Sequence, residues 1–353
     1  MDERTTLQDI AVHCNLSIST VSRVLNGNAG DFRIAAATTE KVLNTAKKLN
    51  YRPNRLARAI RGRKTNLLGL SMPETASGDD TTERRFAIEH RIMGVICAAI
   101  MQHPLFSKYD LVLHNRHERA VLPMNENDMQ QDLIDGMIYA SPLAQHLEFL
   151  KTLSSNIPTV LMGYIPELQD STICVDVDNR KMAQLATEHL LSIGRQNILL
   201  LIPETSLFAF GIQGRIAGHR EALEKAGLRI NPDLTRVIRA DADIVADFIR
   251  TSPALEHTDA ILCLTDELAM FCMDPLLERG LRIPDDIALM GFGGIDLFSE
   301  KASQLSTVKV PFHNMAYEAT EHLLSVLEGK QPYTPGFYEV PTELVIREST
   351  VKS

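Results

Sequence analysis

The sequence predicts a chain of two unlike parts, a small all-α head followed by a large α/β body. Residues 1–51 contain three short stretches whose apolar side chains recur at helical spacing. After residue 64, short apolar runs alternate with longer helical patterns, which is typical of doubly wound parallel sheets. The length of 353 residues exceeds what one hydrophobic core usually holds and indicates two or three domains.

The formal net charge of −9 is unevenly distributed along the chain. Residues 1–64 carry twelve Lys and Arg against five Asp and Glu, whereas the remaining residues carry 24 against 40. A small basic head on an acidic body is expected when only the head contacts a polyanion. The alternative is a basic pair of helices that is merely solvated, and charge alone does not separate the two.

The chain is expected to be cytoplasmic. No apolar run approaches the roughly 18 residues of a membrane span, and the charged start MDERTTLQDI is unlike a secretory signal. The five cysteines are scattered without a Cys-x-x-Cys pair, so we expect buried free thiols in a reducing compartment.

The head is predicted to begin with two short helices. Thr6 can cap a helix over Leu7–Cys14. Ser17 can cap a second helix over Ile18–Leu25 in the same way. Asn15 lies between them and tolerates the positive φ that a tight turn often requires. The predicted buried stripe of the second helix consists of Val21, Val24 and Leu25.

A third helix, from about residue 38 to 49, is expected to bury Val42, Leu43, Ala46 and Leu49. Three short helices with a three-residue turn between the first two match a helix-turn-helix unit. The outer face of the second helix then carries Ile18, Ser19, Ser22 and Arg23. Such a helix fits the DNA major groove, where Arg reads guanine and hydroxyls meet phosphates. The alternative is a three-helix bundle whose polar face only meets water.

The connector YRPNRLARAIRGRK, residues 51–64, joins the head to the body. Pro53 ends the third helix because it pushes Arg52 toward an extended conformation. The segment NRLARAIR spans only about two helical turns, and an isolated helix of that length is not stable in water. We therefore expect it to fold only when docked, for instance on DNA beside a partner helix, with its arginines supplying the attraction.

The head and connector resemble those of a known family. The segments TLQDIA, LSISTVSRVLNG and YRPNRLARAIRG closely resemble the λ-repressor-like DNA-binding head and the hinge of the LacI/GalR family of bacterial transcription regulators. The resemblance implies a homodimer on a near-palindromic operator in double-stranded DNA, with hinge helices in the central minor groove. It assigns 1–51 to the helix-turn-helix domain, 52–64 to the hinge, and 65–353 to an effector-binding and dimerisation domain.

The resemblance also implies roles for individual residues. The predicted base contacts are Ile18, Ser19 and Arg23. The predicted phosphate contacts are Thr6, Ser17, Thr20, Ser22, Asn26 and Thr38. The predicted minor-groove contacts of the hinge are Asn54, Ala57, Arg58 and Ile60.

Three features of this region depart from the family pattern. Ile60 stands where leucine is usual, and a β-branched side chain is a stiffer, shorter wedge for kinking DNA. The loop NGNAGDFRIAAATTEK is about three residues longer than the common form, and Ala35 occupies the place of a capping serine. Because of Ile60, the kink geometry and operator preference are not expected to follow directly from the family pattern.

The body is predicted to alternate strands and helices. Strands are expected at 66–72, 110–114, 137–140, 158–162, 197–202, 260–264 and 287–292, and helices at 86–101, 181–193, 216–226, 267–279 and 315–327. The order, with DGMIYAS, LTDELA and LRIPDDIALMGF as markers, resembles the periplasmic-binding-protein-like effector domain of the same family. The resemblance implies two doubly wound parallel-sheet subdomains, about 65–175 with 312–340 and about 176–311 with 341–353, joined by three crossovers.

A ligand cleft is implied between these subdomains, because such clefts lie at the carboxyl ends of parallel strands. Arg215 matches the arginine that most family members use to hold a sugar hydroxyl or an anion. The predicted effector contacts are Pro73, Glu74, Tyr164, Phe210, Arg215, Thr265, Asp266 and Gly293.

The cleft lacks three polar groups that are common in the family. Gly163, Thr265 and Gly293 stand where Asp, Asn and Asp are frequent. Unpaired sugar hydroxyls would cost about 1–3 kcal/mol each, so a neutral hexose or pentose in the usual pose is not expected. Either the effector is anionic, phosphorylated or less hydroxylated, or the cleft has lost its ligand. The sequence favours an effector such as a sugar acid or phosphorylated sugar, held by Arg215.

No catalytic site, metal site or cofactor is predicted. His114 and His117 lack a third ligand at matching spacing, and the glycine-bearing segments 210–218 and 291–294 fit no nucleotide-binding pattern and are expected to be turns. The chain is therefore expected to be a transcriptional repressor of a metabolic operon and not an enzyme. The alternative is a solute-binding protein or sugar-related enzyme built on the same body, which leaves the basic head unexplained.

Overall fold

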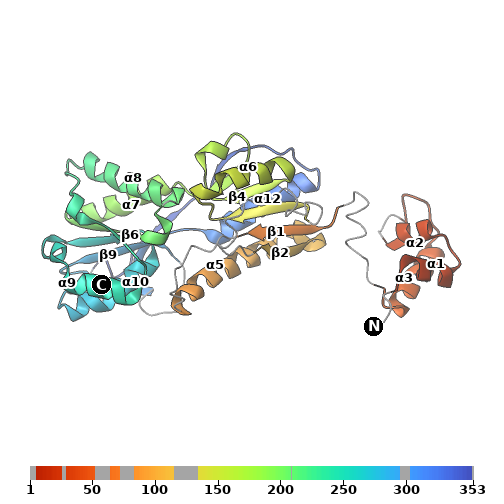
Figure 1. Ribbon diagram of the computed structural model, residues 1–353, viewed down its shortest axis with the longest axis horizontal. Coiled ribbons are helices and arrows are strands. Elements are labelled where there is room, and N and C mark those ends of the chain that lie inside the picture. Colours follow the sequence, from red (N-terminus) through yellow and green to blue (C-terminus); the bar gives the residue numbers. More distant parts are fainter. Residues whose placement is uncertain are drawn as a thin grey trace. The chain divides into compact units, whose positions relative to one another are not determined.

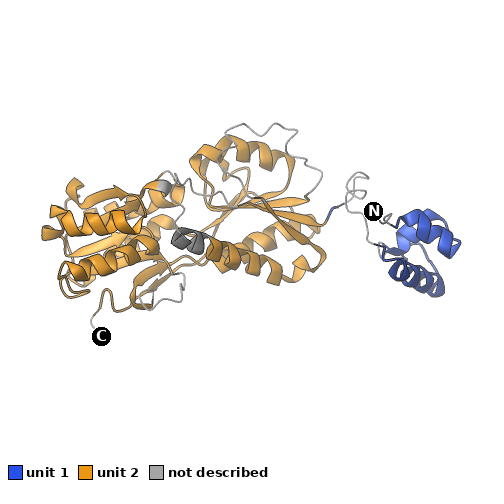
Figure 2. Ribbon diagram, turned by 60° about the horizontal axis from the view of Figure 1, so that its bottom comes forward, with its two compact units in different colours: residues 1–65 blue, residues 66–353 orange. Residues whose placement is uncertain are grey.

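The structure is a computed structural model that describes residues 5–25, 29–51, 64–71, 83–114, 134–207, 209–294 and 303–351. The chain divides into two compact units, Met1–Thr65 and Asn66–Ser353, which are coloured separately in Figure 2. Several residues with predicted roles lie outside the described residues: Asn26, Asn54, Ala57, Arg58, Ile60, Pro73, Glu74 and His117.

Three helices form the head: α1 (Leu7–Cys14), α2 (Ile18–Leu25) and α3 (Ala36–Lys48) (Figure 1). The turn between α1 and α2 contains a left-handed residue, Asn15, with a φ of 51°. One apolar cluster joins the three helices, and Ile10, Val21 and Val42 are fully buried in it. The head is therefore a closed three-helix unit with its own core.

The prediction that Leu43 is buried is wrong, because its side chain is 50% exposed. Val42 and Ala46 lie four residues apart and occupy the inward face of α3. Leu43 is rotated about 100° around the helix from Val42 and points away from the core.

The first subdomain of the body contains a parallel sheet in the order β11-β5-β4-β3-β1-β2. Helices α5 (Glu83–Gln102) and α12 (Phe312–Leu327) cover one face, and α6 (Leu147–Asn156) covers the other (Figure 1). The strands are β1 (Leu67–Ser71), β2 (Asp110–His114), β3 (Gly136–Ala140), β4 (Thr159–Met162), β5 (Ile173–Asp176) and β11 (Gly336–Glu339).

The second subdomain contains a sheet in the order β12-β10-β9-β8-β6-β7, parallel except at the β12 edge. Helices α7 (Asn179–Ser192) and α8 (Phe210–Lys225) pack on one face, and α9 (Ala242–Thr251) and α10 (Asp266–Glu278) pack on the other. The strands are β6 (Ile198–Pro203), β7 (Thr235–Ile238), β8 (Ala260–Cys263), β9 (Ala288–Gly293), β10 (Ser306–Lys309) and β12 (Glu343–Val345).

The described chain passes between the two sheets three times, from β5 to α7, from β10 to α12 and from β11 to β12. The predicted fold class, an all-α head and two parallel-sheet α/β subdomains, is confirmed. None of the described helices is long and apolar enough to cross a membrane. The carboxyl ends of the strands in both sheets lie next to these crossings, where a cleft was predicted.

The prediction of a turn at residues 210–218 is wrong, because this segment forms the first half of α8, which begins six residues earlier than expected. Its glycines allow α7 and α8 to pack closely. A Cβ at Gly218 would overlap the backbone oxygen of Arg180, and a Cβ at Gly214 would press on Asn179. Residues 291–293 likewise lie in β9, and only Gly294 follows the strand, with a φ of 66°.

Candidate nucleic-acid interface and ligand cleft

The outer face of α2 carries the three residues predicted to contact DNA bases. Ile18 is 43% exposed, and Ser19 and Arg23 are also exposed. Val21 and Val24 are buried on the opposite side and hold α2 against the head core. The structure therefore brings the three predicted base contacts together on one accessible helix face.

Hydroxyl groups gather at the N-terminus of α2. The Ser17 hydroxyl lies 2.8 Å from the hydroxyls of Ser19 and Thr20, and it accepts a hydrogen bond from the Thr20 backbone N–H at 3.1 Å. The first turn of α2 contains no acidic residue. Hydroxyls and backbone N–H groups at a helix N-terminus suit a phosphate oxygen, as predicted for Ser17 and Thr20. Ser22 is half-buried on the same helix.

Thr6 is committed to a capping box at the start of α1. Its hydroxyl donates to Asp9 Oδ2 at 2.8 Å and accepts from the Asp9 backbone N–H at 3.3 Å. The Thr6 backbone N–H and hydroxyl both lower the pKa of Asp9, so the carboxylate stays ionised. Thr6 therefore has no hydroxyl proton left for a phosphate unless it leaves Asp9.

Thr38 is half-buried in the first turn of α3, whose N-cap is Ala35. Ala35 provides no side-chain cap, as its position in the sequence predicted. Thr38 therefore lies next to backbone N–H groups at the start of a helix, which suits its predicted phosphate contact.

The cleft is organised around Arg215, which projects from α8. Its Nε donates to Asn179 Oδ1 at 2.9 Å, and its Nη1 donates to the backbone oxygen of Leu264 at 2.8 Å. Its guanidinium carbon lies 5.0 Å from the centre of the Phe292 ring. Burial lowers the pKa of Arg215 to about 10, against the attraction of two nearby carboxylates, those of Asp176 and Asp266.

Asp266 is bonded within the second subdomain. Its Oδ1 accepts from the Thr307 hydroxyl at 2.7 Å, and its Oδ2 accepts from the Gly294 backbone N–H at 2.6 Å. Burial raises the pKa of Asp266 although these hydrogen bonds favour the ionised form. The neighbouring Thr265 caps α10 by accepting from the Leu268 backbone N–H at 3.4 Å. Both predicted effector contacts thus have structural partners.

Asp176, at the end of β5, was missed by the sequence reasoning. Its Oδ1 accepts from the Val177 backbone N–H at 2.7 Å, and its Oδ2 accepts from Asn179 Nδ2 at 3.3 Å. Burial raises the pKa of Asp176 to about 6. The signal in the sequence was an acidic residue directly after an apolar run, in ICVDVDN.

Gly163 and Gly293, where the resemblance leads one to expect aspartates, both occupy positions that favour glycine. Gly163 has a φ of 136°, and a Cβ there would lie 2.5 Å from Pro142 Cδ. Gly293 has a φ of 145°, and a Cβ there would lie 3.0 Å from Asp266 Oδ2. Both positions have a backbone conformation that favours glycine, and at Gly163 the Pro142 ring also leaves no room for a Cβ. A carboxylate cannot simply be restored at either place.

Comparison with known proteins places head and body in one family. Residues 6–54 match the family of bacterial regulatory proteins, lacI family, and residues 187–350 match the periplasmic binding protein-like domain. The HTH-type transcriptional regulator DegA of Bacillus subtilis (strain 168) is 30% identical, over 98% of this chain and 98% of the relative. The chain belongs to the lacI family of bacterial regulatory proteins. The ribose operon repressor of Halalkalibacterium halodurans is 28% identical, over 98% of this chain and 97% of the relative.

A solved structure shares the fold. The lac repressor dimer bound to operator and the anti-inducer ONPF superposes with a TM-score of 0.80 at 24% identity, covering 99% of this chain and 100% of that chain. The family predicted from the head and hinge motifs is therefore confirmed.

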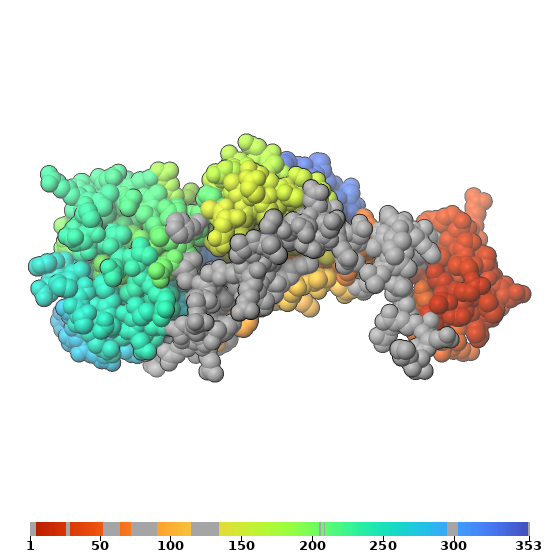
Figure 3. Space-filling view, viewed as in Figure 1, coloured from red at the N-terminus to blue at the C-terminus, as the bar shows by residue number. Residues whose placement is uncertain are grey.

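Two further predicted contacts of this lacI-family cleft lie near the first subdomain. The Tyr164 hydroxyl donates to Gln169 Oε1 at 2.8 Å, and its ring lies 5.0 Å from that of Phe337. Phe210 begins α8 and packs against the apolar cluster under α6. In Figure 3 the green surface of the second subdomain adjoins the yellow-green surface of α6. Phe210 thus links the two subdomains.

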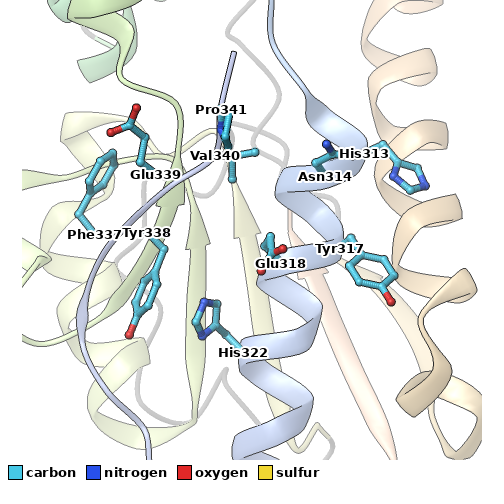
Figure 4. Close-up of a pocket in the computed structure, with 10 residues that line it drawn as sticks. All are labelled: His313, Asn314, Tyr317, Glu318, His322, Phe337, Tyr338, Glu339, Val340 and Pro341. Carbon is cyan, nitrogen blue, oxygen red and sulfur yellow. The ribbon is translucent and has the colours of Figure 1, made fainter. Parts of the chain in front are cut away.

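A separate groove of about 660 Å³ lies between α12 and β11. Figure 4 shows Glu318 and His322 on the side of α12 that faces the β11 segment, with the His322 ring 4.1 Å from that of Tyr338. Its lining residues belong to 313–322 and 337–341, which contain none of the predicted effector contacts. Within the described ranges, no three His, Cys, Asp or Glu side chains lie close enough to hold a metal ion.

Proposed function

We propose that the chain is a transcriptional repressor that binds near-palindromic operator DNA as a homodimer, in the cytoplasm, and that a small molecule in the cleft controls it. The relatives support this, because those matched over almost the whole chain are named as transcriptional regulators or operon repressors. We propose this in place of an enzymatic role.

One observation carries the DNA-binding proposal. The only arginine of α2 shares an exposed helix face with Ile18 and Ser19, next to the hydroxyl groups at the N-terminus of that helix. An arginine on such a face can donate two hydrogen bonds to guanine O6 and N7, while the hydroxyl groups fix the helix against phosphates. The alternative, a polar helix face that only contacts water, does not explain why the arginine and the hydroxyl groups lie together.

Binding to duplexes selected from a random pool tests the proposal. We expect the selected duplex to bind at least about 10³-fold more tightly than bulk genomic DNA at the same salt concentration. Arg23→Ala should cost about 1–3 kcal/mol at one base position and leave non-specific binding almost unchanged. If Arg23→Ala weakens binding to selected and random duplexes equally, the base-reading role is wrong.

The partners of Arg215 in the cleft indicate which class of effector the cleft can bind. Arg215 already donates to Asn179 and to Leu264, and the carboxylates of Asp176 and Asp266 offset its charge. We therefore propose a neutral or cationic polar effector in preference to the sugar acid or sugar phosphate that the sequence favoured. A thermal-shift screen separates these classes, because a ligand at 100 times its Kd stabilises the folded state by about 2.7 kcal/mol. Stabilisation by sugar acids or phosphates alone would reverse the preference.

A further inference from the structure

We infer that Phe32, in the loop between α2 and α3, is a positioning residue that holds Arg23 ready to read a base and so helps to set operator specificity. This inference rests on the proposed function and refines its DNA-reading step. The guanidinium carbon of Arg23 lies 3.9 Å from the centre of the Phe32 ring. That distance places the cation directly over the aromatic face.

The loop holds Phe32 by its own backbone. The Ile34 N–H donates to the Ala29 oxygen at 2.9 Å, and the Arg33 N–H donates to the Gly30 oxygen at 3.0 Å. Arg33 adopts the left-handed conformation, with a φ of 50°. This nested pair of hydrogen bonds closed by a left-handed residue is the arrangement of a Schellman motif. Phe32 therefore lies in a hydrogen-bonded turn with a defined backbone conformation.

Other side chains of the loop anchor it to the head. Ala29 and Ile34 pack against the apolar cluster of the head. The Phe32 side chain is 48% exposed. A large apolar ring kept half in water beside an exposed arginine is explained better by contact with that arginine than by core packing.

Stacking leaves the hydrogen-bonding edge of Arg23 available. An aromatic ring covers the flat face of a guanidinium, while the N–H donors point outward in the guanidinium plane. Guanine O6 and N7 accept from that edge. Holding a long, flexible side chain in place before binding reduces the conformational entropy lost when the base contact forms. On this inference, the long loop between α2 and α3 serves to place Phe32 against Arg23.

Phe32→Ala tests the inference in the full-length protein, on the best duplex selected from the random pool. We expect a two- to fivefold loss of affinity for that duplex, the range of an exposed cation–π contact, with unchanged binding to random DNA and an unchanged salt slope. The loss should appear as relaxed preference at the single base position that Arg23→Ala also relaxes.

Two replacements of Phe32 distinguish aromatic stacking on Arg23 from the effect of side-chain size alone. Phe32→Tyr keeps the aromatic face and should bind like the wild type, whereas Phe32→Leu keeps apolar bulk and should behave like Phe32→Ala. Val12→Ala removes another exposed apolar side chain of the head, 67% exposed on α1, and should change nothing. If Phe32→Leu restores wild-type binding, the ring acts through packing and the inference is wrong.

A double-mutant cycle gives the decisive result. In the Arg23→Ala background, Phe32→Ala should have no further effect, because its role passes through Arg23. Additive losses would overturn the inference. A wild-type protein without preference for any duplex would instead overturn the proposed function, so the two failures are distinguishable.

Discussion

At the starts of α1 and α2 in the head, hydroxyls bond to partners two or three residues away, as Thr6 does to Asp9 and Ser17 to Ser19 and Thr20. In the cleft, local bonds such as those of Asp176 are joined by bonds between distant segments. Arg215 bonds to residues 36 and 49 positions away, and Thr307 bonds to Asp266 across 41 positions. A site built from local contacts is readable from a short stretch of sequence, whereas the cleft exists only once both sheets have formed.

The two regions also differ in electrostatics. Asp9 is exposed, and hydrogen bonds from Thr6 lower its pKa. Asp176 is buried, and loss of hydration raises its pKa to about 6 in spite of its hydrogen bonds. The Asp9 carboxylate is therefore stabilised by hydrogen bonds in contact with water, whereas the Asp176 carboxylate is bonded but loses its hydration.

The largest expected effect is on the packing that supports the cleft. Gly218→Ala places a methyl group against the backbone of Arg180 and forces α8, which carries Arg215, away from α7. We expect a destabilisation of about 3 kcal/mol. Thermal unfolding should show a fall in Tm of roughly 5–10 °C.

Gly94→Ala is the matched control for this substitution. Gly94 is exposed within α5, and a Cβ there would meet nothing within 4 Å. Alanine is the better helix former by about 1 kcal/mol, so this variant should be as stable as the wild type or more stable. Equal Tm values for the Gly218 and Gly94 variants would contradict the close-packing explanation.

A smaller effect is expected on the pH dependence of stability. Asp176 has a folded-state pKa of about 6 against an ordinary value of 3.8, so the folded protein keeps a proton that the unfolded chain releases. Its contribution to stability is therefore lost as the pH rises from about 4 to 6. Asn does not titrate, so Asp176→Asn should gain roughly 2–3 kcal/mol relative to the wild type between pH 4 and pH 7.

Urea denaturation at each pH measures this change, and Asp9→Asn should show the opposite sign. The lowered pKa of Asp9 gives stability that is present above its unfolded-state pKa and is lost as the pH falls through its folded-state pKa. Asp9→Asn should therefore lose stability relative to the wild type at neutral pH, with the difference vanishing in acid. Parallel pH profiles for the wild type and Asp176→Asn would refute the burial argument.

The smallest expected effect concerns the cap of α1. Thr6→Ala removes both hydrogen bonds of the Thr6 hydroxyl to Asp9 and should destabilise the head by about 1 kcal/mol. Circular dichroism during thermal unfolding of the full chain would detect an earlier loss of helix. Thr6→Ser, which keeps the hydroxyl, should retain most of the stability. If the wild type, Thr6→Ala and Thr6→Ser lose helix at the same temperature, the cap does not stabilise the head.

The sequence by itself determined the elements whose signals are local. The bounds of α1 and α2, the caps Thr6 and Ser17 and the left-handed Asn15 were all predicted, because each depends on neighbours within one or two turns. Central strands such as β3, β8 and β9 were also predicted, because strands buried on both faces are continuous apolar runs. The central strands β5 and β10 were not predicted, because each is only four residues long and contains polar residues. The exposed face of α2 followed from the same helical period.

Only the tertiary structure decided the rest. The edge strands β7, β11 and β12 are half-exposed and carry no continuous apolar run, so pairing with a neighbouring strand defines them. The glycines of α8 form a helix because close packing on α7 outweighs their weak helix propensity. The grouping of Arg215 with two buried carboxylates joins segments far apart in the chain, and the stack of Phe32 on Arg23 joins α2 to the loop that follows it. Both depend on how elements meet in space, which local propensity does not encode.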